Sequence, residues 1–197
     1  MNHIFYLMGK SASGKDTAYE ILLSDPSLHL TPFVPWTTRP IRAKEKEGVE
    51  YHFTDEEGLK RLIQEGRVIE KRTYQTEHGP WTYFTVDPGD TSGDLLGIGT
   101  LESYLRLRDF YGNGRVVPIY IEVDDGIRLG RALKRECKPG NHKYEEMCRR
   151  FLADQKDFSE ENLQNAGISR RFSNNSDRSD CVRKITSFIR SIQEAGE

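Results

Sequence analysis

Residues 3–17 read HIFYLMGKSASGKDT, an apolar run that ends at Met8 and passes directly into a glycine-rich segment. Glycines 9 and 14 and the following Lys15 give the spacing Gly-x-x-x-x-Gly-Lys between a strand-like and a helix-like stretch. In that setting successive backbone N–H groups point into one concavity, and the helix dipole adds positive potential. The stretch therefore predicts a polyphosphate site in which Lys15 neutralises the terminal phosphates. The alternative is a glycine-rich turn with a surface lysine.

Strand-like and helix-like segments alternate along most of the chain. Two further buried strands are expected at LLGIG (residues 95–99) and RVVPIYIEV (residues 115–123). Helical patterns occupy residues 15–25, 101–112, 124–136 and 178–192. This alternation predicts an α/β fold, a P-loop NTPase-like core whose parallel sheet is flanked by helices.

Two segments interrupt the alternation. Residues 33–87 contain extended stretches and one short helix, so we interpret them as an inserted subdomain. Residues 136–145 form a polar, turn-rich break between two helices. The chain is predicted to be one domain with its core in residues 1–32, 88–130 and 146–197.

The charge balance limits the classes of partner. A formal net charge of −2 over 197 residues gives no basic field that would attract nucleic acid. No apolar run has the length of a membrane span, and Lys10 follows the apolar run where a signal peptide needs small residues. Three cysteines without paired spacing favour a reduced, cytoplasmic protein.

A second anion site is suggested by TTRPIR and EKEGVEYHF. Arg39 and Arg42 stand three residues apart in a segment that Pro40 keeps extended, and Tyr51 follows. Two guanidinium groups and a phenol can converge on one phosphate. Glu70 in VIE can accept from two adjacent N–H groups on one base edge, as guanine offers. Taken singly, these residues also suit a solvated loop and an exposed strand end.

Together, the phosphate loop, TTRPIRAKEKEGVEYHF and VIE resemble the guanylate kinase family in order and distance. The resemblance implies ATP-dependent phosphorylation of GMP with Mg²⁺, and a GMP-binding subdomain inserted at residues 33–87. It implies that Arg39, Arg42 and Tyr51 hold the GMP phosphate and that Glu70 binds guanine. In EHGPWTYFT we assign Tyr83 to the GMP site, with Trp81 and Thr85 as alternatives in an open register.

The resemblance also places the ATP site and a lid at residues 131–145. The ATP site would comprise the loop, the first turn of the next helix and one later residue: Gly9, Lys10, Ser11, Ala12, Ser13, Gly14, Lys15, Asp16, Thr17 and Asn174. Arg135 and Arg150 match family arginines that neutralise the transferring phosphoryl group, with Arg150 a better match than Arg149. Lys15, Arg135 and Arg150 are therefore the predicted catalytic residues.

Several positions depart from the family pattern. Pro35 replaces a serine that assists guanine recognition, and Gly97 and Gly99 stand where aspartates are expected. Asp16 follows the P-loop lysine, where a hydroxyl is usual. We hypothesise that the metal-binding carboxylate has moved to Asp16, with the two glycines leaving room for that arrangement. The alternative is that Asp16 only complements the helix dipole, worth about 0.3–1 kcal/mol, while Thr17 or water serves the metal.

Two other functions remain open. One is a kinase for a different nucleotide or phosphorylated small molecule, because Pro35 weakens the match to guanine recognition. The other is a non-catalytic guanylate-kinase-like module that binds phosphorylated partners. Such modules tend to lose the P-loop, which this chain retains at Gly9, Gly14 and Lys15. The sequence leaves the oligomeric state open.

Overall fold

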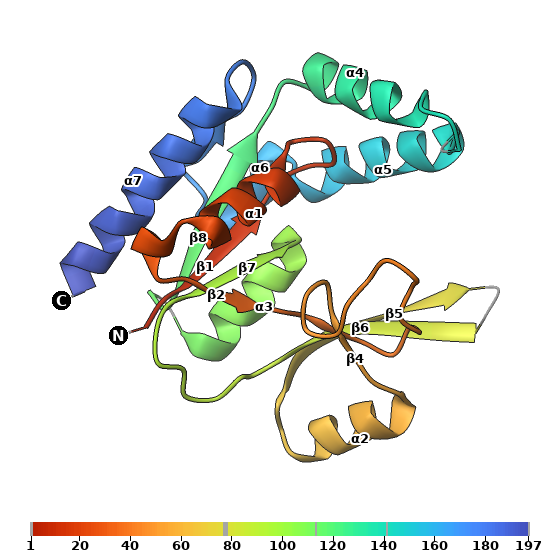
Figure 1. The fold of residues 1–197 in the computed structure, drawn as a ribbon, viewed down its shortest axis with the longest axis vertical. Coiled ribbons are helices and arrows are strands. Elements are labelled where there is room, and N and C mark those ends of the chain that lie inside the picture. Colours follow the sequence, from red (N-terminus) through yellow and green to blue (C-terminus); the bar gives the residue numbers. More distant parts are fainter. Residues whose placement is uncertain (1, 77–78, 113, 141, 197) are drawn as a thin grey trace.

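The computed structural model describes residues 2–76, 79–112, 114–140 and 142–196, and its centre is a β-sheet (Figure 1). Within these ranges the sheet has five strands in the order β2–β7–β1–β8–β9. All neighbouring pairs run parallel. The strands are β1 (Ile4–Met8), β2 (Thr31–Phe33), β7 (Leu95–Gly99), β8 (Val116–Glu122) and β9 (Arg171–Ser173). The predicted parallel α/β core is confirmed.

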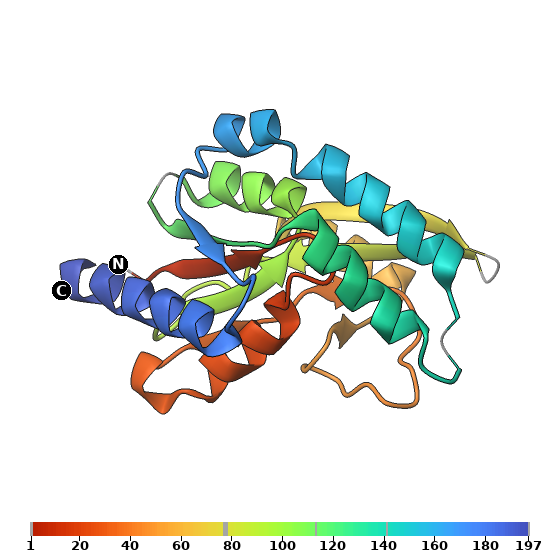
Figure 2. The same cartoon turned by 90° about the horizontal axis from the view of Figure 1, so that it is seen from above.

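Helices cover both faces of this sheet because its central strands are apolar on both sides. The covering helices are α1 (Lys15–Ser24), α3 (Leu101–Tyr111), α6 (Glu160–Asn165) and α7 (Arg178–Gly196). Alternate residues of the buried strand β1 enter two different cores. Phe5 and Leu7 pack against α1 and α7, whereas Tyr6 and Met8 pack against α3 and α6. Figure 2 shows these two pairs of helices on opposite sides of the sheet.

A second, smaller sheet stands beside the core (Figure 1). In the described part of the chain its strand order is β4–β3–β6–β5. Its elements are β3 (Trp36–Thr37), β4 (His52–Phe53), α2 (Glu56–Gln64), β5 (Val68–Thr76) and β6 (Gly79–Val86). Leu59 and Leu62 of α2 pack with Phe84 and so cover one face. The predicted insertion spans this sheet and also Phe33, which pairs in β2 of the core.

The opposite face of the small sheet carries polar and aromatic side chains. Strands β5 and β6 are antiparallel, and their register pairs Glu70 with Thr85 and Arg72 with Tyr83. Directly paired residues lie on the same face of a sheet. These four side chains therefore share the face that α2 leaves uncovered.

Helices α4 (Asp125–Glu136) and α5 (Tyr144–Asp157) lie side by side as an arm beside the loop that follows β1 (Figures 1 and 2). A short 3₁₀ turn, η1 (Pro26–Leu28), follows α1. The lid predicted at residues 131–145 corresponds to the distal part of this arm.

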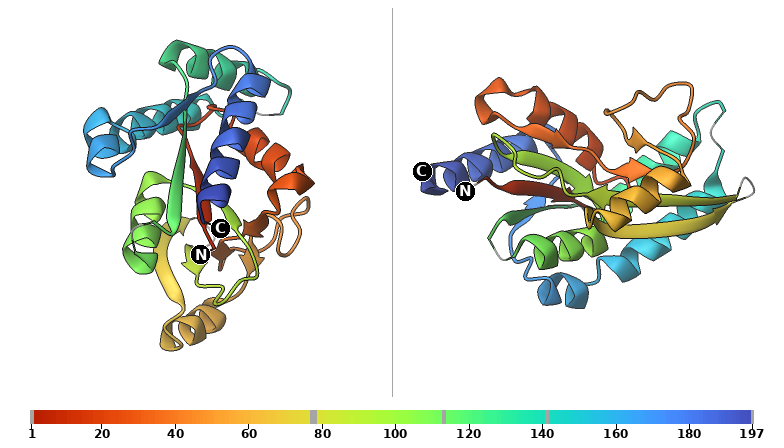
Figure 3. Two further views of the ribbon diagram at one scale, coloured as in Figure 1. Left: turned by 90° about the vertical axis from the view of Figure 1, so that its left-hand side faces the viewer. Right: turned by 90° about the horizontal axis from the view of Figure 1, so that it is seen from below.

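The elements expected to carry function meet at the carboxyl ends of the core strands. Met8, the last residue of β1, pairs with Gly99 of β7 and with Tyr120 of β8. The loop after β1 and the start of α3 therefore leave the same edge of the sheet. The marked chain ends lie at the opposite end of the molecule (Figure 3). None of the helices in the described ranges has the length and apolar content to cross a bilayer.

Candidate active site

The loop between β1 and α1 has the backbone conformation that a phosphate site needs. Gly14 precedes α1 with φ of 88°, in the left-handed region that glycine adopts without steric cost. Ala12 also has a positive φ of 63°, and the N–H of Ser13 donates to the carbonyl of Lys10 at 3.1 Å. No side chain caps α1. Its first N–H groups are therefore available to an anion, which the helix dipole favours.

Lys15 and Asp16 occupy the first turn of α1. The Lys15 ammonium is 3.5 Å from the Asp16 carboxylate, and the Asp16 side chain is 79% exposed. Mg²⁺ prefers hard oxygen ligands and keeps several of its own waters. The Asp16 carboxylate suits that donor set, as does the hydroxyl type of the next residue, Thr17, and the exposure of Asp16 leaves space for water. The residues present therefore fit a Mg²⁺ ion, and metal binding by Asp16 remains a prediction.

The buried side chain of Asn174 supports the loop through a hydrogen bond to its backbone. Its side-chain Nδ2 donates to the carbonyl of Ser13 at 2.8 Å, and the residue is 3% exposed. A Cβ on Gly14 would lie 2.6 Å from that nitrogen, a second reason for glycine there. Arg131 of α4 donates to the Asn174 carbonyl at 2.9 Å. In this structure Asn174 braces the loop, and its place in the ATP site remains a prediction.

Arg39 lies at the centre of the predicted acceptor-phosphate pocket. The side chain is 2% exposed, and Nη1 and Nη2 donate to the two carboxylate oxygens of Glu45 at 2.9 and 2.8 Å. Nε donates to the Tyr83 hydroxyl at 3.2 Å, and the guanidinium lies 5.5 Å from the Tyr51 ring centroid. Hydrogen bonds from Arg39 hold the pKa of Glu45 below its usual range. This pair orients a permanent cation at the pocket.

The structure brings three of the predicted GMP-site residues together here. The rings of Tyr51 and Tyr83 meet edge to face at 5.5 Å between centroids. Burial raises the pKa of Tyr51, so its hydroxyl stays a neutral donor at physiological pH. The Arg42 side chain is exposed on the adjoining loop, and its backbone N–H donates to Glu45 at 2.9 Å.

Glu70 lies on the same face of the small sheet as Tyr83 and contacts helix α3 of the core. Its side chain is 5% exposed and accepts from the Thr85 hydroxyl at 2.8 Å. The Ser103 hydroxyl of α3 donates to it at 3.5 Å, and Arg72 Nε lies 3.3 Å away. Arg72 also donates to Thr100 at 3.2 Å. These contacts hold the predicted base-reading carboxylate at the end of β7, next to the strand that leads into the P-loop.

The space above Gly97 and Gly99 is filled, which corrects the expectation that these glycines leave room for a metal arrangement. The Tyr6 side chain of β1 packs across both positions. A Cβ on Gly99 would lie 2.1 Å from the Tyr6 hydroxyl oxygen, and one on Gly97 would lie 2.7 Å from the ring. Burial raises the pKa of Tyr6 far above its usual value. Glycine at positions 97 and 99 therefore provides the space that the Tyr6 side chain occupies at the end of β7.

Gly99→Ala is expected to destabilise the protein by about 2–3 kcal/mol, because the added methyl overpacks a buried, rigid ring. Urea unfolding measures the free energy. Gly130→Ala in α4 is the matched control, since its Cβ would meet nothing within 4 Å. Adding Tyr6→Phe to Gly99→Ala removes the closest atom and should restore part of the loss. Wild-type stability in Gly99→Ala would show that Tyr6 moves freely.

The predicted arginines of the arm bind acidic residues of their own helices. Arg135 Nε donates to Glu136 at 3.1 Å, and Arg150 Nε donates to Glu146 at 2.6 Å. Arg149 shares Glu146, and the two arginines lower its pKa to about 2. The Arg135 and Arg150 side chains are 51% and 58% exposed, respectively. Their role at the transferring phosphoryl group remains a prediction.

Sequence reasoning missed Glu45, Arg72 and Ser103. Glu45 is one of several acidic residues in AKEKEGVE, and only the folded loop distinguishes it. Arg72 carried a usable signal, because a residue two positions after Glu70 on a strand shares its face. Ser103 joins through the packing of α3, which no local pattern indicates.

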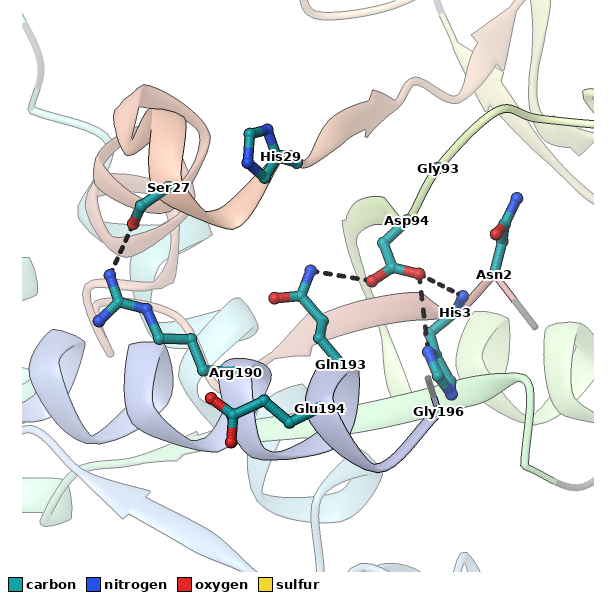
Figure 4. Close-up of a pocket in the computed structure, with 10 residues that line it drawn as sticks. All are labelled: Asn2, His3, Ser27, His29, Gly93, Asp94, Arg190, Gln193, Glu194 and Gly196. Atoms are coloured by element: carbon teal, nitrogen blue, oxygen red, sulfur yellow. Dashed lines mark hydrogen bonds and ion pairs between the residues drawn. The ribbon is translucent and has the colours of Figure 1, made fainter.

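A cavity of about 490 Å³ lies at the other end of the sheet, between the start of β1 and α7 (Figure 4). Asp94 there accepts from the His3 N–H at 2.6 Å and from the Gln193 side chain at 2.9 Å. Arg190 donates to the Ser27 hydroxyl at 2.6 Å. These groups satisfy one another and lie far from the strand ends that carry the P-loop.

Comparisons with known proteins agree with this geometry. Residues 1–80, which contain the P-loop and the Arg39–Glu70 stretch, match the family model described as guanylate kinase. A guanylate kinase of Mycobacterium bovis is 32% identical over 136 residues, 68% of this chain and 53% of that protein. The resemblance to guanylate kinases is confirmed. A guanylate kinase of Mycoplasma genitalium is 35% identical over 137 residues, 67% of this chain and 55% of that protein.

The likeness of fold to a solved guanylate kinase covers nearly all of the chain. The crystal structure of guanylate kinase from Anaplasma phagocytophilum matches with a TM-score of 0.66 and 19% identity, covering 96% of this chain and 85% of that one. The chain spans about half the length of the curated guanylate kinases that it matches, 53% and 55% for the two above.

Proposed function

We propose that this protein transfers a phosphoryl group from ATP to a nucleoside monophosphate, most specifically GMP, giving GDP and ADP. One observation supports this above all. Glu70, the residue suited to guanine's N–H edge, is buried at the end of β7, next to the strand that leads into the P-loop. A base held there and a polyphosphate at α1 would share one edge of the sheet, which is the arrangement that direct transfer requires.

The chain's own residues supply positioning and positive charge. The acceptor oxygen of a monophosphate is already anionic near neutral pH, so the reaction needs little acid–base help. Lys15 and the N–H groups at the start of α1 would bind the ATP phosphates. Mg²⁺, held at Asp16, would neutralise phosphate charge when bound. Arg39, Arg42 and Tyr51, with Tyr83 beside them, would hold the acceptor phosphate.

The arm would complete the site. Closure of residues 131–145 toward the P-loop would bring Arg135 and Arg150 to the transferring group and exclude water, which suppresses ATP hydrolysis. We further propose a cytoplasmic enzyme of purine nucleotide metabolism whose partners are small-molecule nucleotides, with no nucleic acid or membrane partner.

A coupled assay with ATP–Mg²⁺ and each of GMP, dGMP, AMP, CMP and UMP tests the proposal. Turnover that is selective for GMP or dGMP supports it. Selective turnover of another acceptor would favour a kinase for a different nucleotide. Pro35 is consistent with that alternative, because it replaces a serine that assists guanine recognition. GMP or phosphopeptide binding without turnover would favour the non-catalytic module.

Asp16→Ala is expected to raise the Mg²⁺ concentration that half-saturates phosphoryl transfer by at least about tenfold, because a metal-site carboxylate is lost. Titration of the rate with Mg²⁺ at fixed ATP measures this. Asp16→Asn keeps an oxygen ligand and should fall between wild type and Asp16→Ala. An unchanged Mg²⁺ requirement, with only a small loss of stability, would assign Asp16 to the helix dipole instead.

A further inference from the structure

We propose that Arg128 and Asp154 are positioning residues that clamp the P-loop at Ser11 and thereby set its affinity for ATP. Neither residue belongs to the sets predicted from the sequence. The inference rests on the proposed function only in taking ATP as the nucleotide of the loop. We call Arg128 and Asp154 with the Ser11 backbone the Ser11 clamp.

Both backbone groups of Ser11 are held by the arm. Its N–H donates to Oδ2 of Asp154 on α5 at 2.7 Å. Its carbonyl accepts from Nη1 of Arg128 on α4 at 3.1 Å. The same Nη1 lies 3.4 Å from Asp154 Oδ2, which closes a three-membered network. One residue of the P-loop therefore joins the two helices of the arm.

Arg128 is built into the interior rather than left on the surface. The side chain is 1% exposed, and its Nε and Nη2 donate to Oδ1 of Asp125 at 3.1 and 2.8 Å. The guanidinium lies 4.4 Å from the centroid of the Phe151 ring. A buried cation is tolerated only when it is paired and hydrogen-bonded. The buried Arg128 side chain therefore connects the arm to the loop through these hydrogen bonds.

Lys10 extends the connection by one residue. Its ammonium donates to the side chain of Gln155 on α5 and lies 3.8 Å from Asp125 on α4. Gln155 also donates to Asp125. Two successive loop residues are thus attached to the base of the arm. Lys10, predicted as an ATP-site residue, reaches the arm in this structure.

The Ser11 clamp lies next to the residue of the loop with the least favourable backbone conformation, Ala12. Ala12, next to Ser11, has a left-handed φ of 63°, which is unfavourable for a residue with a side chain. Such a conformation persists when its surroundings fix it. A loop held in shape before ATP arrives loses less conformational entropy on binding, which strengthens affinity. The acceptor residues Arg39 and Tyr51 make no contact with the clamp among the interactions described.

The test compares the affinities for ATP and GMP in Asp154→Ala, Arg128→Leu and the double variant by calorimetry. Each single variant is expected to raise the Kd for ATP by about tenfold, since a hydrogen bond to a charged group is lost. The double variant should bind ATP about as tightly as the weaker-binding single variant, because the three groups of the network act as a unit. The Kd for GMP should stay within about twofold of wild type. Asp157→Ala, the same change one turn later on α5, is the control.

The double variant guards against misfolding, because it replaces the buried pair by apolar side chains beside Phe151 instead of stranding one charge. Circular dichroism confirms folding at the assay temperature. An unchanged Kd for ATP in folded variants, an equal rise in the Kd for GMP, or penalties that multiply in the double variant would each overturn the proposal. Wild type that binds ATP but phosphorylates no monophosphate would contradict the proposed function alone. Wild type that fails to bind ATP would overturn the clamp as well.

Discussion

Lys15→Ala is expected to lower the rate of phosphoryl transfer by about 10²–10³-fold, with the fold intact. Lys15 is the cation at the start of α1, where the helix N–H groups and its ammonium would face the terminal phosphates of ATP. A preorganised charge of this kind stabilises the transition state more than the ground state, so its loss falls mainly on kcat. Steady-state kinetics with saturating ATP and GMP measure the effect.

The control for Lys15→Ala is Lys60→Ala, which removes an exposed lysine from α2 in the small sheet. Its kinetic constants should match those of wild type. Circular dichroism and urea unfolding of both variants separate a loss of chemistry from a loss of structure. Turnover of Lys15→Ala within about threefold of wild type would mean that another cation serves the phosphates, and the P-loop assignment would fail.

Arg39→Leu is expected to destabilise the protein by about 3 kcal/mol and to raise the KM for GMP strongly. The substitution removes the buried partner of Glu45, whose carboxylate then stays in the pocket without its two strongest hydrogen bonds. Removing one member of a buried ion pair leaves an uncompensated charge. Urea unfolding at pH 7 measures the stability, and steady-state kinetics measure the KM.

The pH dependence of stability isolates this pair. Arg39 lowers the pKa of Glu45 in the folded state, so the unfolded chain binds more protons in the acid range. The pair's contribution is therefore fully present above about pH 4.3, the ordinary glutamate pKa, and is lost as pH falls through the lower folded pKa. Arg39→Leu should lose this acid-range dependence.

Arg39→Leu/Glu45→Gln, which carries no orphan charge, should recover stability at pH 7. Equal stability of the single and double variants would contradict the pairing.

Much of the fold could be predicted because its signals are local. The central strands β1, β7 and β8 are apolar runs bounded by turns, and each appears close to the expected position. The edge strands β2 and β9 have three residues each. Segments that short are defined by their pairing with a neighbour and carry no periodicity of their own. The sequence therefore indicated the centre of the sheet and left its edges open.

The candidate site divides in the same way. Lys15, Arg39 and Glu70 stand in motifs whose spacing is readable along the chain. The partner Glu45 could not be singled out, because its role depends on how the loop after Pro40 closes. Tyr6 could not be assigned either. Its contact with β7 depends on the register between two strands that are far apart in the sequence.

The packing of Tyr6 over Gly97 and Gly99 also constrains protein engineering. Carboxylates grafted onto β7 to imitate the more usual guanylate-kinase pattern would collide with the phenol unless position 6 received a smaller side chain in the same design. Positions 6, 97 and 99 would therefore have to be replaced together. A change at one of them alone is expected to fail, whereas the combined replacement is expected to succeed.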